Sequence, residues 1–594
     1  MNARYSIGID LGTTNSVLAY CPLADTAAIP RVLPIPQIVA SGTIEPRDSL
    51  PSFCYLPPGN EQAALRLPWE AEPPQFSVGV LARDRAAEVP DRVVVGAKSW
   101  LAYPRVDRRG PILPWDAGPE VPKISPLEAS VRYLRHLVEA WNHARPEALI
   151  SDQVVVLTVP ASFDPAARDL TRQAALSAGL PESLVLLEEP QAALYRWLAG
   201  HADRWRDELH AGDELLVVDV GGGTTDLTLI RLVDCDGSVD LQRCAVGNHL
   251  LVGGDNMDLA IAHWMSEKFA SQGRSLDPWQ NISLWHACRA TKERLLGEGG
   301  PESETISVFQ RGSRLIGGTI TTSLHRQELT DFLLRGFFPP CDASARPEPV
   351  LASGFQDIGL QYEADPAITR HLAAFLTDHH SLPTHLLFNG GVFRAAPLRS
   401  AVAQQITTWC AGRSPLRLGG AIDLDHAVAL GGAYYGWSKQ RGGIRIRGGT
   451  ARSFYIGIES SGPAIPGAPR PLRALCVAPL GMEEGTEADV PGQEVGLIVG
   501  RPAKFRFFSS TTRKEDQPGQ RLQNLNTGEL IESDPIEMTL SADEVTTDHP
   551  LVPVHFQSRV TELGMFQLWC RSASSDQSWK MEFNAREDAQ VARS

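Results

Sequence analysis

Two short segments of this chain follow one pattern, and their repetition constrains the fold more than any other feature. In residues 8–16 and 217–226, an apolar strand ends in a carboxylate (Asp10 or Asp219), breaks at glycines and threonines, and resumes as a strand. Each segment therefore predicts a tight β-hairpin. Glycine lets backbone amides approach an anion closely and threonine hydroxyls add donors, so each turn is a phosphate-sized nest. We expect two facing nests to clamp a polyphosphate, with both aspartates beside its Mg²⁺.

The two turns differ from the common nucleotide-binding loops. A P-loop needs Gly-Lys-Ser/Thr leading into a helix, and the glycines of a dinucleotide fingerprint also open a helix. Here the chain returns to a strand. A single glycine-rich turn usually meets only the backbone needs of a hairpin. The second copy, with the same order of aspartate, glycine and threonine, favours phosphate binding.

Length and charge limit the remaining possibilities. At 594 residues the chain exceeds a single core and predicts three or four units. Its hydrophobic share of 43% and charged share of 21% are ordinary for a globular protein. The formal net charge of −15 disfavours a nucleic-acid partner.

The cysteines and the N-terminus indicate the compartment. Nine cysteines are spread without a Cys-x-x-Cys pair, which argues against a zinc ribbon or a thioredoxin-like site. No basic and apolar leader precedes the first strand, and no apolar run approaches the length of a membrane span. The sequence therefore predicts a cytoplasmic protein with no membrane partner.

Helical and strand periods alternate along the first 440 residues, which predicts an α/β architecture. Helices are expected at 125–144, 164–180, 189–197, 258–269, 282–296, 396–409 and 425–438, and buried strands at 154–159 and 386–388. The proline-rich segment 337–366 is expected to be an irregular insertion. After a bridge rich in glycine and arginine, short alternating runs predict a β-rich end with strands at 454–458, 505–508, 536–540, 552–556 and 565–569.

Five motifs resemble those of the DnaK-type seventy-kilodalton heat-shock (Hsp70) chaperone family in order and spacing. They are residues 8–16, 158–163 with Arg168, 187–193, 217–226, and 389–391 with 427–429. The resemblance implies an actin-like two-lobed ATPase domain made of duplicated ribonuclease-H-like folds. It implies residues 1–440 for that domain, with lobe I at about 1–210 plus 425–440 and lobe II at about 211–424. A linker at 441–452 and a small β-rich substrate- or partner-binding domain at 453–594 follow.

The family's functional residues map onto this chain one by one. The resemblance implies phosphate contacts by Gly12, Thr13, Thr14, Gly221, Gly222, Gly223 and Thr224, and Mg²⁺ held through waters by Asp10 and Asp219. It implies Lys98 as the catalytic lysine, assisted by Glu189 and Thr224. Contacts around adenosine and between the lobes fall on Gly253, Gly254, Lys292, Gly390, Gly391, Arg394 and Asp425, and an interdomain relay on Pro160 and Arg168. Outside that resemblance, Lys98 and Arg168 are expected to face solvent.

The chain departs from the family pattern in three places. Arg289, Glu293 and Leu296 stand where the family has an acid, a base and a serine around adenosine, and the first two are spaced to pair along a helix. The linker is basic where the family's is acidic. Too few residues follow Trp569 for a helical lid.

These observations predict an ATP-dependent chaperone that couples Mg-ATP binding and slow hydrolysis to a polypeptide client or a dedicated protein partner. The resemblance further implies a co-chaperone or nucleotide-exchange factor, and ADP as the product. Two alternatives stay open: a nucleotide-binding scaffold with little hydrolysis, and a small-molecule phosphotransferase of the same superfamily. A filament-forming relative is disfavoured by the β-rich end.

Overall fold

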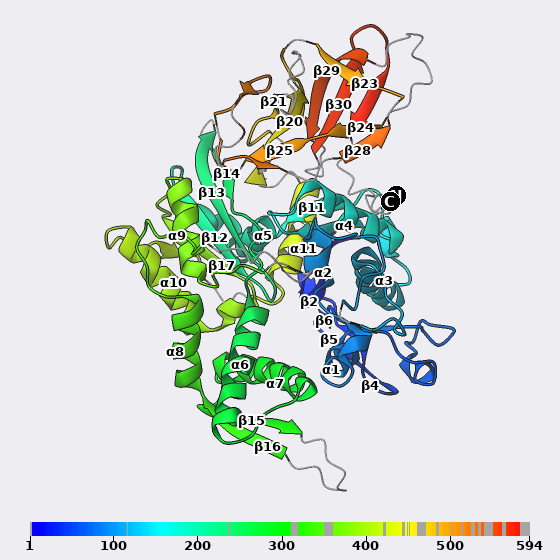
Figure 1. Cartoon of the computed structure of the whole chain (residues 1–594), viewed down its shortest axis with the longest axis vertical. Coiled ribbons are helices and arrows are strands. Elements are labelled where there is room, and N and C mark those ends of the chain that lie inside the picture. Colours follow the sequence, from blue (N-terminus) through cyan, green and yellow to red (C-terminus); the bar gives the residue numbers. More distant parts are fainter. Residues whose placement is uncertain are drawn as a thin grey trace, which may run out of the picture.

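The computed structural model of the chain combines a mixed α/β part with a β-rich part built from its last residues (Figure 1). It describes residues 3–115, 117–235, 238–309, 319–349, 360, 362–419, 423–441, 446–447, 450, 452–459, 471–482, 486–492, 494–500, 502–510, 512–513, 515–523, 525, 529–532, 536–539, 551–560 and 566–581. The predicted α/β class with a β-rich end is confirmed. The domain boundaries stay a prediction.

The first sheet is built around the first hairpin. Its strands follow the order β11-β10-β1-β2-β3, and β6 also pairs with β2. The members are β1 (Tyr5–Leu11), β2 (Asn15–Pro22), β3 (Arg31–Val32), β6 (Leu50–Pro51), β10 (Val154–Val159) and β11 (Val185–Glu188). Strand β1 is antiparallel to β2 and parallel to β10, so Asp10 lies opposite Val17 on one side and Thr158 on the other.

The second sheet repeats this plan. Its order is β18-β17-β12-β13-β14-β19, and the central strand β12 is again antiparallel to its hairpin partner and parallel to the next strand. The members are β12 (Glu214–Val220), β13 (Thr225–Cys235), β14 (Ser238–Val246), β17 (His385–Asn389), β18 (Leu416–Arg417) and β19 (Ile446–Arg447). Both predicted hairpins are therefore present, each in the middle of its own sheet. The shared strand order is that of a duplicated, actin-like fold.

Helices cover these sheets close to where the sequence predicts them. They are α1 (Val80–Arg85), α2 (Ala97–Ala102), α3 (Pro126–Ala144), α4 (Pro165–Ser177), α5 (Glu189–His201), α6 (Gly254–Ser271), α7 (Pro278–Leu296), α8 (Arg326–Phe337), α9 (Ile368–Asp378), α10 (Ala396–Trp409) and α11 (Ala427–Gln440). Helix α11 contacts β1 and α5 at glycines: a Cβ on Gly8 would lie 2.1 Å from the Ala429 carbonyl oxygen, and one on Gly431 would lie 1.8 Å from that of Ala192. Only glycine permits these two close approaches.

Small sheets and hairpins complete the α/β part. They comprise β4 (Ile35–Ala40) with β5 (Thr43–Arg47), β7 (Cys54–Tyr55) with β8 (Ser77–Val78) and β9 (Val93–Val94), and β15 (Ser303–Phe309) with β16 (Thr319–His325). Among the described residues, no helix has both the length and the apolar character that crossing a membrane requires.

Among its described residues, the β-rich part contains two five-stranded sheets and one two-stranded ribbon. The first sheet holds β20 (Ser453–Glu459), β21 (Leu472–Ala478), β25 (Phe507–Ser510), β26 (Arg521–Leu522) and β27 (Ile531–Glu532). The second holds β22 (Glu487–Asp489), β23 (Val495–Ile498), β29 (Leu551–Val560), β30 (Phe566–Ser572) and β31 (Ser578–Met581), and β24 (Pro502–Phe505) pairs with β28 (Ile536–Thr539). The single strand predicted at 505–508 is wrong, because Arg506 separates β24 from β25 and its carbonyl accepts a hydrogen bond from Gly457.

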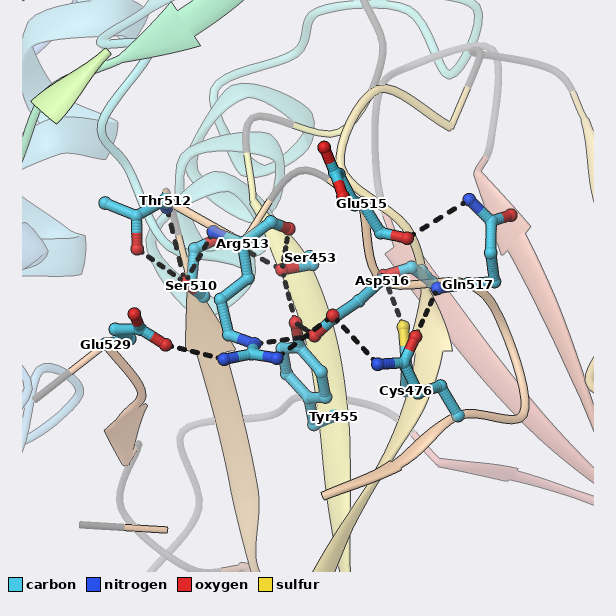
Figure 2. A network of polar contacts seen from close by, with 12 residues as sticks. Ser453, Tyr455, Cys476, Ser510, Thr512, Arg513, Glu515, Asp516, Gln517 and Glu529 are labelled. Atoms are coloured by element: carbon cyan, nitrogen blue, oxygen red, sulfur yellow. Dashed lines mark hydrogen bonds and ion pairs between the residues drawn. The ribbon is translucent and has the colours of Figure 1, made fainter. Parts of the chain in front are cut away.

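A buried polar network fastens a loop to the first of these sheets. Figure 2 shows the hydroxyl of Tyr455 donating to Asp516 at 2.7 Å, with Arg513 holding the same carboxylate at 2.7 Å. Ser453 bonds to the Tyr455 hydroxyl at 2.9 Å. Of the two partners of Asp516, Tyr455 lies on β20 and Arg513 lies in the loop after β25. The network therefore fixes that loop against β20.

Candidate nucleotide-binding site

A cavity of about 500 Å³ lies where the two hairpins face each other. Most residues predicted for nucleotide binding line it: Asp10, Gly12, Thr13, Thr14, Lys98, Glu189, Asp219, Gly221, Gly222, Thr224, Gly254, Lys292, Gly390, Gly391, Arg394 and Asp425. Four predicted residues lie outside the lining: Gly223, Gly253, Pro160 and Arg168. The structure therefore brings residues from distant parts of the chain to one site.

The two turns touch each other across this cavity. A Cβ added to Gly222 would lie 1.9 Å from the Thr14 hydroxyl oxygen, and one added to Gly223 would lie 2.8 Å from Cγ2 of Thr13. Gly253 packs behind the second turn: a Cβ added to Gly253 would lie 2.6 Å from the carbonyl oxygen of Gly222. The Thr14 hydroxyl is buried and has no hydrogen-bond partner among the described residues. A phosphate oxygen is an acceptor that this hydroxyl lacks.

Acidic side chains converge at the centre of the site. Burial raises the pKa of Asp10 and raises that of Asp219 well above its usual range, with the charge of Glu189 adding to the effect on Asp219. Burial also raises the pKa of Glu189 to about 7, although Lys98 opposes the shift. These shifts come mainly from burial, and repulsion between the carboxylates adds to those of Glu189 and Asp219.

Lys98 is the cation placed against these carboxylates. Its Nζ lies 2.5 Å from Oε1 of Glu189, and the lysine is 9% exposed. Although burial lowers the pKa of Lys98, the charges of Glu189 and Asp10 outweigh it and raise the pKa. The expectation of a solvated lysine from residue type alone is therefore wrong. Gly96 begins α2 with a left-handed φ of 65°, which turns the chain just before the lysine.

Two further residues support the aspartates, and sequence reasoning did not assign them to the site. Asn389, at the end of β17, donates a hydrogen bond of 2.7 Å to Asp219. Thr158, on β10, donates one of 3.4 Å from its hydroxyl to Asp10. Both follow from the register, because Asn389 lies opposite Asp219 and Thr158 opposite Asp10. The parallel pairing of these strands was the signal that could have identified them.

A third unassigned group, Asp226, connects the second hairpin to the segment after β10. Its carboxylate bonds to the hydroxyl of Ser162, which also lies 2.7 Å from Nδ1 of His249. Burial raises the pKa of Asp226, but the hydrogen bonds of His249 and Ser162 outweigh burial and lower it. Asp226 is thus held ionised in the cavity wall.

The wall formed by α6 and α7 differs from the pairing that the sequence suggested. Arg289 does not pair with Glu293: its guanidinium bonds to Asp255, and its Nε lies 2.9 Å from Asp258. Nζ of Lys292 forms an ion pair with the other oxygen of Asp258, at 2.7 Å. The buried Asp258 and the half-buried Asp255 at the start of α6 lie within ion-pair distance of Arg289, whereas Glu293 is exposed at the cavity.

Arg168 is buried, contrary to the expectation for an arginine outside the family resemblance. Its Nη2 lies 2.6 Å from Oε1 of Glu188 and donates to the Ala161 carbonyl at 3.1 Å. Its Nε donates to the Phe163 carbonyl at 3.3 Å. These bonds hold the segment that follows Pro160 against the end of β11.

The donor set fits a magnesium ion and a polyphosphate. Oxygen ligands from Asp10 and Asp219 are those that Mg²⁺ prefers, and Mg²⁺ keeps several of its waters when carboxylates bind it. The positive charge of Mg²⁺ would favour the ionised form of Asp219, whose pKa is raised by burial and further by the charge of Glu189. Backbone amides of glycine-rich turns suit phosphate oxygens, and so does the Thr14 hydroxyl, which has no partner among the described residues.

Comparison with known proteins assigns the family. The family model described as "Hsp70 protein" matches residues 116–343. The chain is 30% identical to the "Chaperone protein HscA homolog" of Ralstonia nicotianae over 447 residues, 72% of this chain and 57% of the relative. It is 34% identical to that of Pseudomonas aeruginosa over 309 residues (50% and 42%) and 32% identical to that of Azotobacter vinelandii over 300 residues (50% and 42%).

The chain spans about half the length of the curated relatives it matches. Hsp70 proteins are ATPases with an actin-like nucleotide-binding fold, which agrees with the duplicated sheets and the cavity between them. On its sequence motifs, its fold and these relatives, the chain belongs to the Hsp70 family.

Proposed function

We propose that this protein is an ATP-dependent chaperone that binds Mg-ATP in the cavity, hydrolyses it slowly and couples nucleotide state to binding of a polypeptide by its β-rich part. One observation carries the proposal. Two hairpins from separate sheets meet around a single cavity, and the Lys98–Glu189 pair faces Asp10 and Asp219 there. A polyphosphate held by both turns joins the two sheets.

The phosphates are assigned to the turns. Gly12, Thr13 and Thr14 bind them from the first turn, and Gly221, Gly222, Gly223 and Thr224 bind them from the second. When bound, Mg²⁺ neutralises phosphate charge beside Asp10 and Asp219. Gly223 also lets the two turns approach each other, because a Cβ on it would lie 2.8 Å from Cγ2 of Thr13.

Hydrolysis is assigned to the centre of the site. Lys98 stabilises the negative charge that develops as water attacks the terminal phosphoryl group. Glu189 fixes the lysine by their 2.5 Å ion pair. Asn389 and Thr158 orient the aspartates.

The nucleoside is assigned to the wall between α6, α7 and the segment after β17. Gly253 and Gly254 start α6, Lys292 caps the Gly254 carbonyl at 3.1 Å, and Gly390 and Gly391 follow β17. In the same segment after β17, Arg394 pairs with Asp425 at 3.0 Å. We assign ATP and ADP as the ligands of this wall.

The β-rich part is assigned to a client polypeptide or a dedicated partner, and the α/β part to a co-chaperone or exchange factor. Strand β19 links the two parts, since Ile446 and Arg447 pair in parallel with Leu241 and Gln242 of β14. Pro160 and Arg168 are assigned to the relay between them.

The test compares Lys98→Ala with Lys268→Ala, which removes a lysine of α6 whose Nζ bonds to the Ser323 carbonyl outside the cavity. We expect calorimetry with Mg-ATP to give binding to wild type and both variants, and single-turnover phosphate release to be lost only in Lys98→Ala. Binding without lysine-dependent release favours the scaffold. Release that requires an added metabolite favours the phosphotransferase, and no binding at all refutes the proposal.

A further inference from the structure

The two sheets are joined by a buried group of three charged residues, none of which lines the nucleotide cavity. Glu188 ends β11 of the first sheet, and Arg243 lies on β14 of the second. One oxygen of Glu188 lies 2.6 Å from Arg168, and the other contacts Arg243. The exposed fractions of the Glu188 and Arg243 side chains are 5% and 4%.

When one carboxylate binds two guanidinium groups in a buried site, separating it from either of them has a high energetic cost. Separating one partner leaves a charge in a dry environment, which costs far more than loss of a surface pair. The Glu188–Arg243 contact therefore favours one relative position of the two sheets. Any rotation that moves β14 away from β11 must break it.

Each end of this group is connected to another functional element. At one end, Arg168 bonds to the carbonyls of Ala161 and Phe163, and between them Ser162 bonds to Asp226 in the cavity wall. At the other end, Arg243 directly follows Gln242, whose partner in β19 is Arg447. The charges thus lie between the nucleotide cavity and the strand that leads to the β-rich part.

We propose that Glu188 and Arg243 are positioning residues: their ion pair holds β14 in the place where β19 can pair with it. The role of this ion pair in coupling rests on the proposed function. Its effect on the docking of β19 does not, because that docking is measurable without nucleotide. The ion pair adds a partner in the second sheet to Pro160 and Arg168, which the family resemblance already implied. An energetic connection of this kind needs a measured coupling.

The experiment follows exposure of the linker in the full-length chain. Arg441, Arg445 and Arg447 are trypsin sites by sequence, and the initial cleavage rate at each is measured by mass spectrometry. The test variant is Arg243→Gln, which leaves Glu188 paired with Arg168. The matched control is Arg231→Gln, which removes an exposed pair with Glu214 (2.5 Å) from the neighbouring strand of the same sheet.

We expect Arg243→Gln to increase linker cleavage about tenfold or more, as local opening requires, while Arg231→Gln stays at the wild-type rate. Binding of a fluorescent ATP analogue to Arg243→Gln should remain within about threefold of wild type, because the ion pair lies outside the cavity. Wild-type cleavage in Arg243→Gln overturns the inference. Absence of analogue binding in wild type refutes the proposed function, whereas the cleavage comparison still decides the inference.

A second variant tests the inference if the first variant misfolds. If Arg243→Gln does not melt cooperatively, Glu188→Asp replaces it, since aspartate keeps the charge and shortens the side chain by one methylene. Cleavage about threefold faster than wild type supports the inference, as expected for a strained buried pair. Cleavage at the wild-type rate overturns it.

Discussion

Replacing Gly222 by alanine tests whether the two turns grip the same ligand. The added Cβ would lie 1.9 Å from Oγ1 of Thr14 and 3.1 Å from its Cβ, so the Thr14 side chain must leave its position and the turns must move apart by a few tenths of an ångström. Overpacking of this kind costs about 1–3 kcal/mol. Since each 1.4 kcal/mol is tenfold in affinity, we expect Mg-ATP binding to weaken about 5- to 150-fold. Isothermal titration calorimetry measures the change directly.

A double-mutant cycle assigns the loss to this contact. Thr14→Ala removes the clashing oxygen, so Gly222→Ala should cost about 1 kcal/mol less in the Thr14→Ala background than in wild type. The control is Gly336→Ala in α8, where an added Cβ meets no atom within 4 Å. It should leave binding unchanged. The reasoning is refuted if Gly222→Ala binds as tightly as wild type, or if the two substitutions are additive.

Three further results are expected. Burial raises the pKa of Glu189 to about 7 in the folded, nucleotide-free protein, so folding favours the protonated carboxyl. The free energy of unfolding should therefore fall as pH rises from 4.5 to 7. Mg-ATP binding near pH 7 should release part of a proton. Calorimetry in buffers of different ionisation enthalpy measures that release, and equal heats in all buffers contradict it. Glu293→Arg at the edge of the cavity should tighten ATP about 2- to 30-fold by placing a cation near the base, with no equal gain for tripolyphosphate. Tyr455→Phe should lower the free energy of unfolding of the β-rich part by about 1–3 kcal/mol in urea, because Asp516 loses a buried hydrogen bond; an unchanged midpoint would show that the bond contributes nothing.

Local chemistry was enough to predict the hairpins and most helices. Helix α4 illustrates why: Asp164 accepts a hydrogen bond from the Ala167 amide at 2.6 Å, and the cap alone identifies the start of the helix. The two turns rich in glycine and threonine were found for the same reason, since these residues are adjacent in sequence. The end of the chain was harder, and the break between β24 and β25 at Arg506 leaves no pattern in the residues around it.

Contacts between distant residues were not predictable from pattern. Asn389 and Asp219 are separated by 170 positions, and Ser162 and Asp226 by 64. Only the pairing of strands in three dimensions makes them neighbours. Arg289 shows the same limit, because a helical spacing of four suggested Glu293 while the tertiary fold supplied Asp255 and Asp258.

The burial of Lys98 and Arg168 has a common origin in two consecutive residues. A lone lysine or arginine is expected at the surface, because burying its charge is costly without a partner. Glu188 and Glu189 provide those partners from the point where β11 becomes α5, one toward Arg168 and one toward Lys98. The same strand end therefore fixes the lysine proposed for hydrolysis and the ion pair proposed to position β14. A displacement of this strand end changes both contacts together, so the two proposals predict that linker exposure and phosphate release vary in parallel when Glu188 is shortened.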